Sequence, residues 1–309
     1  MQKYKKEVEE YIKLRLESEI PIARIAREII KEFNLHVTYE AARHKVRSTK
    51  ENVKIKNSAK PIKRLFFDIE TSYYIGWFWR TGKTSFINHN QILEDKKIIC
   101  ISYKWEYEDK VHTLTWSAKK DDKAMIKDFI KILGEADEII AHNGDRFDVK
   151  EIRTRAIKQG LLMFPIYRTL DTLKKSRKYF NFASNKLDYL GEYLEVGRKL
   201  DHEGIDLWHK VQGGDKKALA KMVDYCECDV VLLEDVFQVI NPYIDHNTNF
   251  AVQLGKDKWS CPNCASDKVK LSHTDTTPVG WIRRFMKCLK CQKQYKISNK
   301  TYMRFLTKK

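Results

Sequence analysis

The chain is 309 residues long, carries a net charge of +17 and is 42% hydrophobic. At roughly 100–200 residues per domain, this length predicts two or three domains. The hydrophobic content excludes a disordered chain, and no apolar run approaches the roughly 18–20 residues of a membrane span. The N-terminal residues lack the apolar stretch of a secretory signal. We therefore expect a cytoplasmic protein of a bacterial or phage-infected cell, with no membrane partner.

The positive charge is concentrated at the two ends of the chain. Residues 1–60 carry 15 Lys/Arg and 9 Asp/Glu, and residues 256–309 carry 14 and 3. Residues 61–255 carry 30 of each sign. A neutral centre between basic ends predicts a functional domain flanked by segments that bind a polyanion. The alternative is that the lysines only increase solubility.

Residues 1–50 are predicted to form a small helical domain. Apolar periodicity indicates helices over residues 4–18, from Pro21 onward, and over residues 39–48. The third helix is basic, which resembles a helix-turn-helix whose last helix enters the major groove. This pattern predicts nucleic-acid contact by this domain, with docking to a protein as the alternative. The expected contact residues are Arg43, Lys45 and Arg47. The polar residues 51–62 are predicted to be a linker.

The neutral centre opens with a buried strand that carries two acids. Asp68 and Glu70 are two residues apart, so both project from one face of the strand. Buried acids are costly unless a cation binds them. Further patterns predict strands over residues 98–105, 111–116 and 138–143, and helices over residues 119–133, 148–159 and 219–239. The last helix carries Tyr225 and Asp229 on one face.

Four acids with oxygen-rich neighbours can hold two divalent cations. Such a pair of ions clamps the attacking and leaving oxygens of a phosphodiester in line. Oxygen ligands favour Mg²⁺ or Mn²⁺ over zinc. The candidate ligands are Asp68, Glu70, Asp148 and Asp229.

Three motifs in this order resemble those of the DnaQ-like 3′–5′ exonucleases. They are Asp68-Ile-Glu70, Asn143-x3-Phe147-Asp148 and Tyr225-x3-Asp229. The tyrosine is typical of the DEDDy type, and the wider pattern is most similar to stand-alone relatives of the family-B DNA polymerase proofreading domain. Asp171-Thr-Leu and the stretch from Ser184 to Gly191 are also typical of that group. The resemblance covers residues 63–242.

The resemblance implies an α/β, RNase H-like fold with a mixed five-stranded sheet flanked by helices. It implies that the four acids ligate two Mg²⁺ or Mn²⁺ ions, that Asp68 bridges both ions, and that Tyr225 orients the attacking water. Nucleoside 5′-monophosphates would leave a 3′ end. Asn143 would contact the substrate or support the site, and Asp171 is expected to be mainly structural. Trp77 follows the first catalytic strand, where it would stack on a base or pack in the core.

The segment Thr81-Gly-Lys-Thr84 is similar to the end of a phosphate-binding loop. The P-loop pattern requires four residues between its two glycines, whereas Gly76 and Gly82 are separated by five. We therefore do not predict nucleoside triphosphate binding.

The C-terminal residues 256–309 contain two C-x2-C turns. Four thiolates at this spacing can surround one tetrahedral zinc ion, with alternating strands between the turns, as in a zinc ribbon. All four positions of the ion would be filled, so this zinc would be structural. Trp281, Arg283 and Arg284 are expected to contact nucleic acid, although Trp281 and its neighbour Phe285 can equally cover the ribbon core. The predicted zinc ligands are Cys261, Cys264, Cys288 and Cys291.

The sequence thus predicts a metal-dependent exonuclease domain over residues 63–245, held on nucleic acid by the two basic ends. DNA is expected more than RNA, and a replication or repair protein can be a partner in trans. Two alternatives stay open. The chain can be a non-catalytic nucleic-acid-binding or assembly protein with a relic nuclease fold, or a structure-specific endonuclease.

Overall fold

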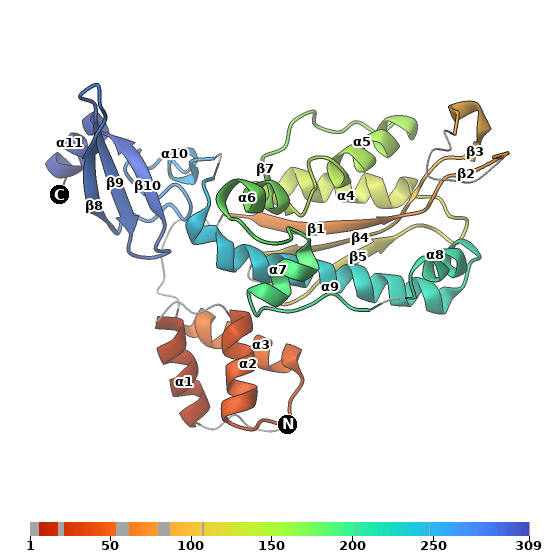
Figure 1. The fold of residues 1–309 in the computed structure, drawn as a ribbon, viewed down its shortest axis with the longest axis horizontal. Coiled ribbons are helices and arrows are strands. Elements are labelled where there is room, and N and C mark those ends of the chain that lie inside the picture. The colour runs from red at the N-terminus through yellow and green to blue at the C-terminus, as the bar shows by residue number, and fades with distance from the viewer. Residues whose placement is uncertain are drawn as a thin grey trace. The chain divides into compact units, whose positions relative to one another are not determined.

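The computed structural model describes residues 6–17, 22–53, 62–79, 87–106, 108–201, 203–246 and 248–308. They form two compact units, which are treated separately below (Figure 1). The first unit comprises Arg64–Asp171 and Arg198–Leu233. The flanking unit comprises Met1–Lys63, Thr172–Gly197 and Glu234–Lys309.

A mixed five-stranded sheet forms the centre of the first unit, as the family resemblance implies. Its strand order is β5-β4-β1-β6-β7. The central strand β1 pairs antiparallel with β4 and parallel with β6, while β6 pairs parallel with β7 and β4 pairs antiparallel with β5. The strands are β1 (Arg64–Thr71), β4 (Ile98–Trp105), β5 (His112–Thr115), β6 (Glu138–Ala141) and β7 (Thr169–Asp171).

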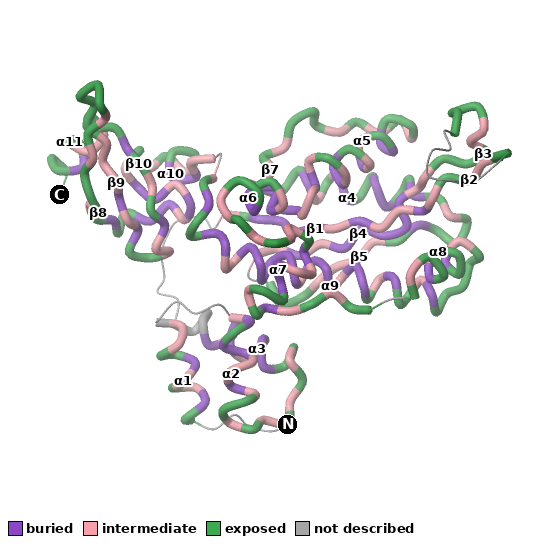
Figure 2. Tube along the Cα trace, viewed as in Figure 1, coloured by how far each residue is buried: buried purple, intermediate pink, exposed green. Residues whose placement is uncertain are grey.

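Helices cover both faces of this sheet (Figure 1). Leu65, Phe67 and Ile69 of β1 point to the face that packs against α4 and α5. The other face places Ile99 and Cys100 against α8 and the first part of α9. Figure 2 shows the sheet strands largely buried between these layers. The elements are α4 (Lys123–Glu135), α5 (Asp148–Lys158), α8 (Ile205–Gln212) and α9 (Lys216–Ile240), with a small hairpin of β2 (Ile75–Gly76) and β3 (Ile92–Glu94).

A three-helix bundle begins the flanking unit. Its core contains Val8, Ile12, Ile25 and Ile29, in the periodic positions that predicted the helices. The bundle consists of α1 (Lys6–Glu17), α2 (Ile22–Glu32) and α3 (Tyr39–Val53). Helix α3 therefore extends three residues into the predicted linker, of which residues 54–61 lie outside the described part of the chain.

The expectation that Arg43 and Arg47 contact nucleic acid is corrected by the structure. Arg43 is 1% exposed and Arg47 is 6% exposed. Arg43 donates hydrogen bonds to Glu234 and Asp235 of α9, and Arg47 donates to Glu234. A buried guanidinium needs carboxylate partners to offset its desolvation, and here these partners come from the same unit. These two arginines of α3 therefore bind α9 within the flanking unit.

The remaining elements of the flanking unit include a three-stranded sheet near the C-terminus. Its order is β10-β9-β8, with both pairings antiparallel. Met286 and Ile297 of this sheet pack against Phe305 of the last helix. The sequence predicts the outer two strands but not β9 or the last helix. The elements are α6 (Thr172–Tyr179), α7 (Leu187–Tyr193), α10 (Phe250–Gln253), β8 (Val269–Thr276), β9 (Ile282–Cys288), β10 (Gln294–Ser298) and α11 (Asn299–Lys308).

None of the helices in the described ranges is long and apolar enough to cross a membrane.

The buried carboxylate of Asp122 links three elements of the first unit by hydrogen bonds. Asp122, at the start of α4, accepts hydrogen bonds from Arg155 of α5 at 2.7 and 2.8 Å and from the Ile98 amide of β4 at 3.1 Å. Burial alone would raise the pKa of Asp122, but these hydrogen bonds outweigh burial and lower it. The pair therefore stabilises the fold at neutral pH.

We expect Asp122→Ala to lower the free energy of unfolding by about 3–5 kcal/mol, because it leaves the buried Arg155 without its carboxylate. Urea unfolding followed by tryptophan fluorescence measures this change. Asp128→Ala is the matched control, since Asp128 forms an exposed pair with Lys131. An Asp122→Ala protein as stable as the control would contradict this account.

Candidate metal-dependent active site

The structure brings three of the predicted ligands together in the first unit. Carboxylate oxygens of Asp68, Glu70 and Asp229 lie within 4.8 Å of one another. Asp68 and Glu70 share one face of β1, opposite the face that carries Phe67 and Ile69 into the core. Helix α9 crosses this acidic face and supplies Asp229. Oxygen ligands at this spacing suit a hard divalent cation.

The fourth predicted ligand, Asp148, is the first residue of α5 and is 2% exposed. Its charge is close enough to raise the pKa values of Asp68 and Glu70. Its Oδ1 atom is buried and accepts no hydrogen bond from any described residue. A buried carboxylate oxygen without a donor fits a site for a cation. Asp148 is therefore a fourth carboxylate that could hold a divalent cation, beside the three that cluster.

A tight turn between β6 and α5 sets the position of Asp148. Asn143 adopts φ 73°, a left-handed conformation that asparagine tolerates better than most residues. A Cβ on Gly144 would lie 2.4 Å from the Cβ of Ala141, so only glycine fits there. Asn143 is therefore a residue of the turn that delivers Asp148.

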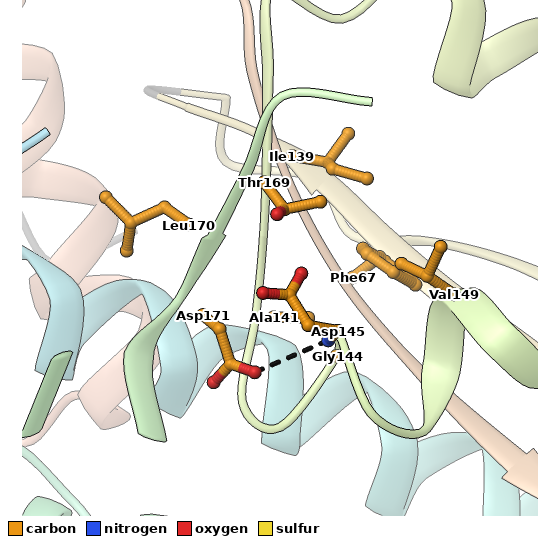
Figure 3. Close-up of a pocket in the computed structure, with 9 residues that line it drawn as sticks. All are labelled: Phe67, Ile139, Ala141, Gly144, Asp145, Val149, Thr169, Leu170 and Asp171. Carbon is orange, nitrogen blue, oxygen red and sulfur yellow. Dashed lines mark hydrogen bonds between the residues drawn. The ribbon is translucent and has the colours of Figure 1, made fainter. Parts of the chain in front are cut away.

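Asp171 holds this turn from the neighbouring strand β7. It accepts hydrogen bonds from the Asn143 amide at 3.0 Å and from the Asp145 amide at 3.4 Å. Figure 3 shows Asp171 hydrogen-bonded to this turn, beside a small pocket that Phe67, Gly144 and Val149 also line. The expectation of a structural role for Asp171 agrees with these contacts, and Asp145 is part of the same turn.

The pKa values of Asp68, Glu70 and Asp148 are raised, and burial is the largest cause for each of them. The pKa of Asp68 is raised further by Asp148, Glu70 and Asp229. Burial and the charge of Asp229 raise the pKa of Glu70 to about 8, and burial raises the pKa of Asp148 to about 7. Without a cation, Glu70 therefore retains a proton at neutral pH, and a divalent ion would displace that proton.

Lys199 is a site residue that the sequence reasoning missed. Its ammonium group donates a hydrogen bond to the Tyr225 hydroxyl oxygen at 3.0 Å and forms an ion pair with Asp229. Burial lowers the pKa of Lys199, but the charge of Asp229 and the hydrogen bonds to Asp229 and Tyr225 together outweigh burial and raise it. Lys199 lies between α7 and α8 in a segment without periodicity, so only the three-dimensional contact identifies it.

Tyr225 stands beside Asp229 on α9, as the spacing predicts. Burial, followed by the charge of Asp229, raises the pKa of Tyr225 to about 12. The phenol therefore keeps its proton at neutral pH. Because Lys199 donates to the phenol oxygen, the hydroxyl hydrogen of Tyr225 is directed to an acceptor other than Lys199.

The other predicted nucleic-acid contacts have different surroundings. Trp77, next to the β2–β3 hairpin, is 69% exposed, so the core-packing alternative for it is wrong. Trp281 is 75% exposed and does not cover the ribbon core. Lys45 forms a partly exposed ion pair with Glu9 of α1, in the same helical bundle. Arg283 pairs with Asp275, and Arg284 lies over the ring of Tyr302. The residues 81–84 that resemble a phosphate-binding loop lie outside the described residues.

The four cysteines of the C-terminal segment converge as the spacing predicts. Their sulfur atoms all lie within 4.8 Å of one another. The Cys261 and Cys291 sulfurs are 3.5 Å apart, and the Cys264 and Cys288 sulfurs are 3.7 Å apart. A tetrahedral zinc site with bonds of about 2.3 Å requires sulfur separations of about 3.8 Å. The cluster therefore fits a four-coordinate metal ion.

Comparisons with known proteins agree with this fold. Residues 91–241, which include Asp148, Tyr225 and Asp229, match the RNase_H superfamily. A DNA polymerase of Thermococcus hydrothermalis is 32% identical over 102 residues, which are 32% of this chain and 6% of that protein. The chain thus spans a small part of the length of this relative.

Among solved structures, the family B DNA polymerase from the hyperthermophilic archaeon Pyrobaculum calidifontis superposes with a TM-score of 0.47 and 17% identity. That superposition covers 61% of this chain and 26% of the polymerase chain. The sequence comparisons show that the chain contains an RNase H-like domain with distant similarity to a DNA polymerase.

We expect Asp68→Asn to stabilise the protein in metal-depleted buffer, because it removes one charge from a repelling cluster. The raised pKa values mean that the folded cluster retains protons that the unfolded chain loses above about pH 4. The loss in free energy of unfolding that the cluster causes therefore grows as the pH rises from about 4 to 8. The gain should be roughly 2 kcal/mol at pH 8.5 and small at pH 4.

Urea unfolding at both pH values measures this gain. Asp224→Asn is the control, since Asp224 lies on α9 and is exposed. Saturating Mg²⁺ should reverse the order at pH 8.5, because the ion stabilises the wild type by about 2.7 kcal/mol at 100 times its Kd and the variant by less. An Asp68→Asn protein that is destabilised under all conditions would refute the repulsion account.

Proposed function

We propose that the chain is a two-metal-ion-dependent 3′–5′ exonuclease of the DEDDy type that releases nucleoside 5′-monophosphates from DNA or RNA. The observation that carries this proposal is the cluster of Asp68, Glu70 and Asp229, with Asp148 close by, on an RNase H-like sheet. The similarity to a DNA polymerase supports a substrate of nucleic acid, DNA more than RNA. Residues 63–245 would form the nuclease domain.

Two divalent ions, held by Asp68, Glu70, Asp148 and Asp229, would supply charge stabilisation at the scissile phosphate and a nucleophile at neutral pH. The chain's own groups prepare the site for this chemistry. Tyr225 keeps its proton and can donate a hydrogen bond to the attacking water or to a phosphate oxygen. Tyr225 therefore orients the nucleophile and does not act as a base.

Lys199 would compensate part of the cluster's negative charge and fix the Tyr225 hydroxyl. Its hydrogen bond to the phenol oxygen leaves the phenol with one direction in which to donate. Asp171 would act at greater distance, since it holds the turn that carries Asp148. A positioning error of about 1 Å in such a site can lower the rate by about 10²-fold.

The four cysteines would bind one structural Zn²⁺, and residues 256–309 would form a zinc ribbon. The sulfur separations support this assignment. A four-cysteine site leaves no open position on the metal, so this ion would have no part in hydrolysis. The ribbon and the helical bundle would hold a substrate or a replication or repair protein near the nuclease.

We expect Asp229→Asn to lower hydrolysis by about 10³-fold, because metal ions supply several kcal/mol of charge stabilisation. Tyr225→Phe should lower it by about 10–10²-fold with little change in the Mg²⁺ concentration required. The measurement is a time course on 5′-labelled single-stranded DNA and RNA with Mg²⁺ or Mn²⁺, in which products shorten from the 3′ end.

Asp224→Asn on the same helix should keep full activity. A covalently closed circular strand tests the endonuclease alternative, since an exonuclease leaves it intact. Binding of both polymers without metal-stimulated cleavage of either would overturn the exonuclease proposal and favour a relic nuclease fold.

We expect the purified protein to contain a single zinc ion per chain, measured by plasma mass spectrometry. Cys288→Ser should lose this zinc and unfold β8 to β10, since a closed zinc site contributes folding energy directly. Cys228→Ser, outside the cluster, should retain the metal. A Cys288→Ser protein with full zinc content and unchanged circular dichroism would refute the ribbon assignment.

A further inference from the structure

The sheet of β8, β9 and β10 has one face packed and one face open. On the packed face, Leu271, Met286 and Tyr295 form a cross-strand row that joins the core with Phe305 of α11. Since side chains alternate along a strand, the neighbouring rows point to the other side. These open-face rows are Lys270–Lys287–Gln294, His273–Phe285–Lys296 and Asp275–Arg283–Ser298.

A pair of stacked rings occupies the middle row of this open face. A β-bulge between Leu271 and His273 brings His273 directly opposite Phe285. The two ring centroids are 4.2 Å apart, and the ring planes differ by 6°. His273 is exposed and Phe285 is half-buried, so the pair presents a flat aromatic surface to solvent. Trp281 precedes β9 and is also exposed.

Positive charge surrounds these rings. Lys270, Lys287 and Lys296 lie in the same or the adjacent row, and no described carboxylate is within ion-pair distance of them. The one acid of the face, Asp275, is paired with Arg283. Residues 256–309 carry 14 Lys/Arg and 3 Asp/Glu. The open face is therefore basic at its edges and aromatic at its centre.

We propose that this open face binds an unpaired segment of nucleic acid, with one base stacked on the Phe285–His273 pair and its phosphates beside Lys270, Lys287 and Lys296. The proposal deepens the proposed function and rests on it only for nucleic acid as the ligand. Aromatic rings in a basic groove are the combination that holds single strands without sequence preference.

The same features disfavour a duplex and a protein. In a duplex the face of each base is covered by its neighbours, so a flat ring pair gains little there. The centres of protein interfaces are depleted in lysine, whereas this face places three lysines around its rings. An unpaired strand matches both the rings and the charges.

The test measures binding by the full chain in the Asp229→Asn background, so that the probe stays intact. Fluorescence anisotropy reports the affinity for a labelled oligothymidylate and for a blunt duplex of equal length. We expect Phe285→Leu, which keeps an apolar side chain but removes the ring, to weaken single-strand binding by about tenfold. Phe285→Tyr should restore it, and duplex binding should not change.

The charges are tested separately through salt dependence. Lys287→Ala and Lys296→Ala should each lower the slope of log affinity against log salt by about 0.7, the value for one lost phosphate contact on a single strand. Lys300→Ala is the matched control, since Lys300 is exposed on α11 and lies outside the open-face rows. It should bind with the slope of the parent.

Parent-like binding by Phe285→Leu and by both lysine variants would overturn the proposal, as would equal losses with Lys300→Ala. Zinc content and circular dichroism check the fold of each variant. If Phe285→Leu loses its zinc, the Lys296→Ala variant decides the test, because Lys296 is exposed and its replacement leaves the core intact. Because binding is measured without cleavage, its failure is distinct from failure of the exonuclease. A wild type that binds single strands through this face but does not cleave them would refute the exonuclease proposal and leave the binding proposal in place.

Discussion

Repulsion among buried carboxylates is the constraint on which the first unit depends. Asp68, Glu70 and Asp229 share a space in which their oxygens lie within 4.8 Å, and Asp148 adds a fourth charge nearby. Burial makes the ionised forms of Asp68, Glu70 and Asp148 unfavourable in the absence of a cation. Lys199 offsets part of the charge through its ion pair with Asp229. The cluster lowers the stability of the fold, and a bound cation would compensate for that loss.

The hydrophobic core of the first unit offsets the stability that the acidic cluster loses. Strand β1 is the central strand, and the face that carries Leu65, Phe67 and Ile69 is buried against α4 and α5. The opposite face carries Asp68 and Glu70. A slip of one residue in the register would exchange the two faces, so the hydrophobic core and the acidic cluster specify the same pairing of β1 with β4 and β6.

Local patterns predicted much of this arrangement. The strand predicted over residues 98–105 has the bounds of β4, and spacing placed Asp68 with Glu70, and Tyr225 with Asp229, each on one face of its element. The strand predicted over residues 138–143 instead ends at Ala141, because Asn143 adopts a left-handed conformation in the turn to α5. The missed features depend on contacts between distant residues. Lys199 is 26 and 30 residues from Tyr225 and Asp229, in a segment without periodicity. Strand β9 and α11 were missed because charged residues interrupt their apolar patterns.

The two basic ends of the chain show why net charge alone does not identify a binding surface. In the helical bundle, Arg15, Arg43, Lys45 and Arg47 are each paired with a glutamate or aspartate of the same unit. Arg43 and its partner Glu234 are 191 residues apart in sequence, so no local pattern shows that the arginine is buried. In the C-terminal sheet, few acids are present and three lysines lie on an uncovered face around stacked rings. A charged segment predicts a polyanion partner only after its internal ion pairs are subtracted, and that subtraction leaves the C-terminal sheet as the stronger candidate.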